Sequence, residues 1–138
     1  MSPKQNATFA YYALFIFLGV LMASTGPLLP SLAEQTRSQI SEISILLSAV
    51  SLGRLLGALL GGRLLDRFAG HPVIVVVLAL TALTVAVIPF ARILLILLLL
   101  YLLLGLLEAV IDVGSNTLII WWHREKVGPY MNALHLCF

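Results

Sequence analysis

A stripe of polar side chains interrupts a long apolar run between residues 93 and 120. Glu108, Asp112 and Asn116 follow one another at intervals of four residues, which places them on one face of an α-helix. A carboxylate at the centre of a bilayer costs about 2.5–3.5 kcal/mol on insertion scales, so it is expected to face protein or water. The stripe therefore predicts a pathway for a solute or an ion. A structural pair between Glu108 and Arg54 inside the bundle is the alternative.

Small residues form a second pattern in the segment 43–65. Gly53, Gly57 and Gly61 lie four residues apart and share one smooth helix face,. In lipid, such a face lets the backbone of another helix approach closely, so it is predicted to be a helix-packing surface. The spacing is compatible with static packing and also with a surface on which two helix bundles slide.

The elements that position these side chains are predicted to be transmembrane helices. Of 138 residues, 61% are hydrophobic and 10% are charged, whereas soluble domains are about 45–50% apolar and about 25% charged. Each apolar run is near the ~20 residues that cross a bilayer. The first run ends at Pro27 and Pro30 and is followed by a polar external loop, 31–42. The predicted spans are 7–29, 43–65, 72–90 and 93–120.

A fifth helix is expected to begin at Pro129, because glycine and then proline precede a new apolar segment,. The segment 129–138, at about 1.5 Å per residue, covers only half of the ~30 Å hydrocarbon core. We therefore expect an all-α, polytopic transmembrane helix bundle, with residues 1–138 forming one transmembrane region of four full spans plus the start of a fifth. The chain is predicted to be the N-terminal piece of a longer protein.

The distribution of lysine and arginine predicts that the N-terminus is cytoplasmic. The membrane is expected to be a plasma or inner membrane. The predicted outer loops contain only Arg37 and Arg92. The predicted cytoplasmic ends contain five basic residues: Lys4, Arg63, Arg67, Arg124 and Lys126.

The junction between the second and third spans contains a short motif. Gly62, three further residues and then Asp66-Arg67 resemble the signature between helices two and three of the major facilitator superfamily. The resemblance implies that Gly62, Asp66 and Arg67 belong to a conformational lock at the end of the membrane. Ala69 and Gly70-His71 depart from the glycine and the basic pair usual in that signature. A solvated topological anchor is the alternative interpretation.

Two later segments, 112–117 and 128–135, extend the resemblance to the fucose-permease and sodium-dependent glucose transporter branch of that superfamily. It implies that Asp112 is the helix-four carboxylate tied to ion coupling. It also implies that Asn132 and His135 line the cavity where helix five begins. Thr25-Gly26 stands where the fucose-type transporters have an acid in helix one, so a proton and sodium both remain candidate coupling ions.

These patterns predict a secondary active transporter, present as an N-terminal fragment, that moves a sugar or a similar small polar solute by alternating access. A small non-transporting membrane scaffold or partner-binding subunit of four helices is the alternative. The expected partners are the lipid bilayer, the solute and C-terminal helices of the same protein, without nucleic acid. The scattered histidines 71, 123 and 135 and the single cysteine form no metal or nucleophile pattern, so neither an enzyme nor a resident cofactor is expected.

Overall fold

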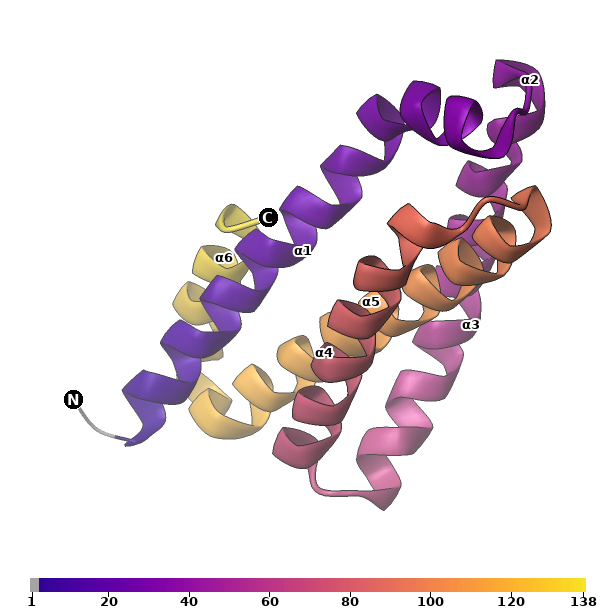
Figure 1. Ribbon diagram of the computed structural model, residues 1–138. Coiled ribbons are helices and arrows are strands. Elements are labelled where there is room, and N and C mark those ends of the chain that lie inside the picture. The colour runs from indigo at the N-terminus through magenta and orange to yellow at the C-terminus, as the bar shows by residue number, and fades with distance from the viewer. Residues whose placement is uncertain (1–2) are drawn as a thin grey trace.

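The chain folds as a bundle of helices. The computed structural model describes residues 3–138, with side chains from Gln5 onward (Figure 1). The side chain of Lys4, which contributes to the predicted orientation, lies outside the described residues. The elements in order are α1 (Pro3–Thr36), α2 (Ile40–Ile43), α3 (Ile45–Arg67), α4 (Gly70–Val87), η1 (Ile88–Phe90), α5 (Leu94–His123), η2 (Arg124–Lys126) and α6 (Val127–Leu136).

The predicted fold class is confirmed. No strand occurs within residues 3–138, and four helical segments are long and apolar enough to cross a membrane. These four segments are Gln5–Thr36, Ile40–Arg67, Gly70–Phe90 and Leu94–Leu136.

The first helix is longer than the sequence predicts. α1 continues through Pro27 and Pro30 to Thr36, so the first part of the expected polar loop is helical. A proline removes one backbone hydrogen bond from a helix interior, which packing elsewhere is able to offset. Leu32 and Ala33 supply that packing, because both are buried in the core cluster at this end of the bundle.

The junction between the fourth and fifth helices also differs in detail. α5 extends to His123 and is followed by the single 3-10 turn η2. Arg124 has a φ of 46°, a left-handed conformation that interrupts a right-handed helix. α6 then begins at Val127, so Gly128 and Pro129 lie in its first turn, where the missing N–H of proline has no cost.

α5 occupies the middle of the bundle. It contacts α1, α3, α4 and α6, and Figure 1 shows α6 running beside the N-terminal half of α1 while α3 and α4 lie on the other side. Two apolar core clusters fill the two ends of the bundle, and α5 contributes to both. Because α5 has protein on several sides, Glu108 of its polar stripe is buried inside the bundle.

Candidate functional site

A cavity of about 310 Å³ lies between α1, α3, α5 and α6. Its volume is at the lower end of the roughly 300–1,000 Å³ typical of small-molecule sites. Apolar side chains form most of its wall, and four residues with ionisable side chains face it from three helices. The lining residues are Phe15, Leu18, Met22, Arg54, Ala58, Glu108, Ala109, Asp112, His135 and Phe138.

Arg54 and Glu108 form an ion pair between α3 and α5. The Nε and Nη2 atoms of Arg54 donate to the same carboxylate oxygen, Oε2 of Glu108, at 3.0 and 2.9 Å. The Glu108 side chain is 2% exposed, and that of Arg54 is 30% exposed. The other oxygen, Oε1, is buried and accepts no hydrogen bond among the described residues. The Arg54–Glu108 pair considered from the sequence is therefore present, and it also lines the cavity.

Asp112 lies one helical turn beyond Glu108 and is an exposed residue on the cavity wall. Asn116 donates from Nδ2 to Asp112 Oδ1 at 2.8 Å and to the Asp112 backbone oxygen at 2.9 Å. Asn116 is not among the residues that line the cavity. Its amide therefore orients the Asp112 carboxylate, a role different from the direct contact with the pathway that the polar stripe suggests.

The fifth-helix residues separate into one that reaches the cavity and one that does not. His135 lines it from α6, and its ring meets the ring of Phe15 edge-on with centroids 5.9 Å apart. Asn132 is exposed on α6 and is not among the lining residues. One helical turn separates the two residues, and the structure brings only His135 beside Asp112 and Glu108.

The glycine face of α3 holds Arg54 next to α5. A Cβ atom built on Gly53 would overlap the backbone oxygen of Leu102, and one on Gly57 would overlap that of Leu106. Gly105 of α5 packs equally closely against α3, since a Cβ atom built on it would overlap the backbone oxygen of Val50. These contacts favour static packing within one bundle over a sliding surface at Gly53 and Gly57. The close approach of α3 and α5 at these glycines allows the side chains of Arg54 and Glu108 to meet.

Gly61 is less constrained, because a Cβ atom there would lie 3.4 Å from the Cβ atom of Val113, an ordinary van der Waals contact.

The lock residues lie at the far end of α3. Asp66 and Arg67 are exposed, and neither side chain makes a hydrogen bond or an ion pair with the side chains that the structure describes, from Gln5 onward. Gly62 faces open space, with no atom within 4 Å of a Cβ built on it. The local geometry therefore leaves both side chains available to another helix end, and their role as a lock stays a prediction.

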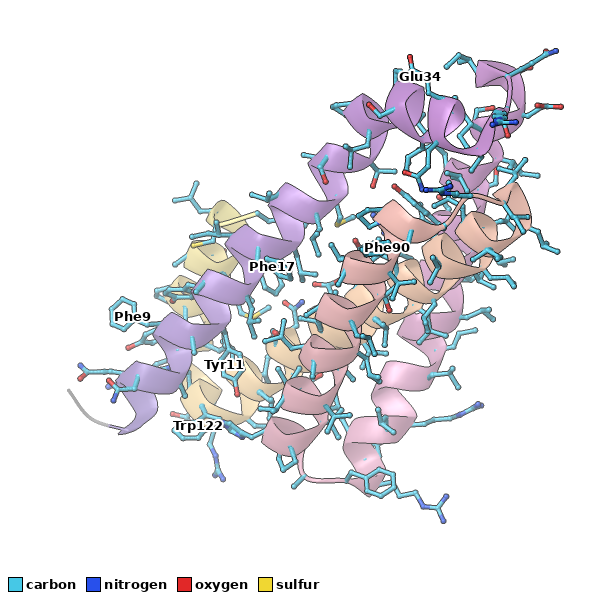
Figure 2. The ribbon with its side chains drawn as sticks, viewed as in Figure 1. Phe9, Tyr11, Phe17, Glu34, Phe90 and Trp122 are labelled. Atoms are coloured by element: carbon cyan, nitrogen blue, oxygen red, sulfur yellow. The ribbon has the colours of Figure 1, made fainter. Side chains whose placement is uncertain are left out.

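Sequence reasoning missed two contacts that tie α1 to distant helices. The Tyr11 hydroxyl lies 2.9 Å from Nε2 of His71, and the Thr8 hydroxyl lies 2.8 Å from Nε2 of His123. Figure 2 shows Tyr11 and Trp122 at the same end of the bundle, and Glu34 at the other. The partners are 60 and 115 residues apart along the chain, so no local pattern signals them.

A third missed contact ties α1 to α4 at the opposite end. The Gln35 side chain donates from Nε2 to the backbone oxygens of Ile88 and Ala91 at 2.9 and 2.6 Å. Ile88 begins the 3-10 turn that follows α4 and Ala91 ends it, and the Ile88 oxygen also accepts from the Ala91 N–H at 3.1 Å. α1 is therefore hydrogen-bonded at both ends: Tyr11 contacts α4 itself, and Gln35 contacts the turn that follows α4.

Comparisons with known proteins support the membrane interpretation. Residues 10–138 match the family model described as Major Facilitator Superfamily. The chain is 32% identical to sodium-dependent glucose transporter 1A of Mus musculus, over 92% of this chain and 30% of that protein. It is 33% identical to sodium-dependent glucose transporter 1 of Danio rerio, over 94% of this chain and 22% of that protein.

Another relative is major facilitator superfamily domain-containing protein 4A of Homo sapiens, which is 30% identical over 93% of this chain and 25% of that protein. The chain thus spans between 22% and 30% of the length of these three relatives. No solved structure matches the chain.

Proposed function

The chain belongs to the major facilitator superfamily and is an integral, multi-pass membrane protein, and from this premise we propose that it builds one side of the solute cavity of a secondary active transporter. The proposed solute is a sugar or a similar small polar molecule, and the proposed mechanism is alternating access between helix bundles. Because the chain spans 22% to 30% of its relatives' length, further C-terminal helices of the same protein are proposed to complete the cavity.

The observation that carries this proposal is the convergence of ionisable side chains on one cavity within the span region. Arg54, Glu108, Asp112 and His135 reach it from α3, α5 and α6. Intramembrane charges are costly and occur mainly where they face protein, water or a transported species. A static scaffold would need the Arg54–Glu108 pair at most, whereas Asp112 is exposed in the cavity. Asp112 therefore supports transport over the scaffold alternative.

Asp112 is the proposed coupling residue. The cavity contains two carboxylates and one guanidinium, so a cation bound near Asp112 would balance its charge. The chain's relatives include proteins named sodium-dependent glucose transporters, which supports sodium, and a carboxylate is equally able to exchange a proton. We propose one of these two ions as the coupling ion.

The proposed orientation follows from the charges at the helix ends. The end of the bundle that carries Arg67 on α3 and Arg124 on η2 is proposed to be cytoplasmic,. The N-terminus lies on the same side in this proposal, and the membrane is a plasma or inner membrane. Gly62, Asp66 and Arg67 would then form a lock between helix ends at the cytoplasmic side.

Asp112→Asn in the full-length protein tests the coupling proposal. Reconstituted in liposomes, this variant should fail to accumulate sugar against a gradient but should retain exchange of labelled for unlabelled sugar, because exchange needs no net movement of the coupling ion. Glu108→Gln should have a milder effect on accumulation, since Glu108 already has a cationic partner. Glu34→Gln is the matched control, because Glu34 is exposed at the far end of α1.

Accumulation by Asp112→Asn equal to that of the unmodified protein would show that Asp112 does not couple transport. Absence of both uptake and exchange in the unmodified protein would instead favour the scaffold alternative.

A further inference from the structure

The Arg54–Glu108 pair is asymmetric in both its bonding and its exposure. Two donors of Arg54 converge on one oxygen of Glu108. A guanidinium has five N–H donors in a fixed fork, so three remain beyond this pair, including both on Nη1. The Glu108 side chain is 2% exposed, whereas 30% of the Arg54 side chain is exposed. Glu108 is therefore the buried anchor, whereas Arg54 is partly exposed and lines the cavity.

A pair whose only task is to join α3 and α5 has no need of this arrangement. Arginine–carboxylate pairs are frequently bidentate, with one N–H to each of the two oxygens. Here both bonds end on Oε2, and Nη1 makes no hydrogen bond to the described residues. This side-on contact, through Nε and Nη2, leaves Nη1 directed away from Glu108, and Arg54 lines the cavity that Asp112 also lines.

We propose that Arg54 is a solute-binding residue whose guanidinium donates hydrogen bonds to hydroxyl oxygens of the transported molecule, and that Glu108 is the positioning residue that holds it. This inference rests on the proposed transport function and deepens it by naming a recognition residue and a solute class. The donors of Arg54 and the acceptors of Asp112 together complement hydroxyl groups, each of which both donates and accepts.

The charges of the cavity select a neutral polyhydroxy solute. Glu108 and Asp112 line the same cavity as Arg54, so the two carboxylates already balance the guanidinium, and no surplus of guanidinium charge is left to bind a carboxylate or phosphate solute. Apart from His135, the remaining wall is apolar, with Phe15, Leu18 and Met22 contributed by α1. Such a wall matches the C–H groups of a sugar ring, while the polar groups fix its orientation.

The test measures which solute hydroxyl Arg54 recognises. The full-length protein is reconstituted in liposomes, and exchange of labelled D-glucose is competed with each of its monodeoxy analogues. A hydrogen bond from a charged donor contributes about 1.5–3 kcal/mol, so the unmodified protein should bind one analogue about 10- to 100-fold more weakly than D-glucose. Arg54→Gln combined with Glu108→Gln should lose this discrimination at that hydroxyl and keep it at the others.

The double substitution is chosen because Arg54→Gln alone would leave the buried Glu108 without its counter-ion, which destabilises a protein strongly. Arg54→Lys is a second variant that retains the positive charge. It lacks the guanidinium fork, so it should weaken binding of D-glucose and reduce discrimination at the same hydroxyl. Arg92→Gln is the matched control, because Arg92 is exposed in the loop before α5. This control should keep the analogue profile of the unmodified protein.

The outcomes separate this inference from the function on which it rests. An unchanged analogue profile in the double variant and in Arg54→Lys would overturn the role of Arg54 and leave the transport proposal intact. A uniform loss of affinity for every analogue, with discrimination preserved, would also overturn it, because that pattern indicates a structural effect. Failure of the unmodified protein to exchange D-glucose, its analogues or any other labelled sugar or polyol would reject both proposals.

Discussion

Replacing Gly53 with alanine tests how closely α3 must approach α5. The added Cβ atom would overlap the backbone oxygen of Leu102 and would lie 2.9 Å from the backbone nitrogen of Leu106. Both atoms belong to the α5 backbone, which cannot turn aside as a side chain can. The two helices must therefore separate at this point, and the neighbouring Arg54 would move away from Glu108.

The expected loss of stability has two parts. Overpacking a well-packed interior typically costs about 1–3 kcal/mol. Loss of a Cα–H···O contact between the glycine and a carbonyl oxygen costs about 0.5–1 kcal/mol more. The gain in helix propensity from glycine to alanine, about 1 kcal/mol in water, acts in the opposite direction. Together these contributions give an expected net decrease of about 0.5–3 kcal/mol in the free energy of unfolding for Gly53→Ala.

Gly61→Ala provides a matched control on the same helix and in the same stripe. Its Cβ atom would lie 3.4 Å from the Cβ atom of Val113, so the helices need not separate and the propensity gain is retained. Unfolding of purified full-length variants in mixed micelles, followed by far-UV circular dichroism during titration with SDS, measures both free energies. Gly53→Ala should unfold at a lower SDS fraction than the unmodified protein, and Gly61→Ala at an equal or higher one.

Equal stability of the two alanine variants would refute this reasoning, because it would show that the α3–α5 contact does not depend on the missing side chain at Gly53. A Gly61→Ala variant less stable than Gly53→Ala would refute it as well.

Two further predictions concern the helix ends. Asp66→Asn should slow transport by the full-length protein in liposomes without lowering its abundance in the membrane. The reason is that an exposed carboxylate at the end of α3 is available for a lock but is not needed for folding. Unchanged transport would leave Asp66 as a topological anchor. In a cysteine-free background, Glu34→Cys should react with a membrane-impermeant maleimide that is added outside intact cells. Glu125→Cys should react only after the cells are permeabilised. The reverse pattern would invert the proposed orientation.

The family and the fold class were predictable from local patterns. The apolar runs predict membrane-spanning helices because only helices and closed barrels satisfy every backbone group in lipid, and the structure has four such segments within residues 3–138. The resemblance based on Gly62, Asp66 and Arg67 is confirmed by the family match over residues 10–138. These features depend on residues close together in the chain, where composition and spacing carry the information.

Helix ends were less predictable. The expected loop after Pro30 begins in the structure only beyond Thr36, because burial of Leu32 and Ala33 stabilises helix that the two prolines disfavour. Such packing involves partners from other helices, and it is absent from any local window of the sequence.

By itself, the sequence determined the membrane class, the helix periodicity and the polar face of α5, since each arises from short-range spacing and from the cost of placing charge in lipid. Only the tertiary structure decided which of these residues meet. It brought His135 to the cavity and left Asn132 outside it, and it placed Asn116 behind Asp112 as its hydrogen-bond donor. It also packed the glycine stripe of α3 against the backbone of α5, which places Arg54 beside Glu108. The physical reason is that helix packing fixes the rotation and separation of each helix through atoms that lie far apart in the chain.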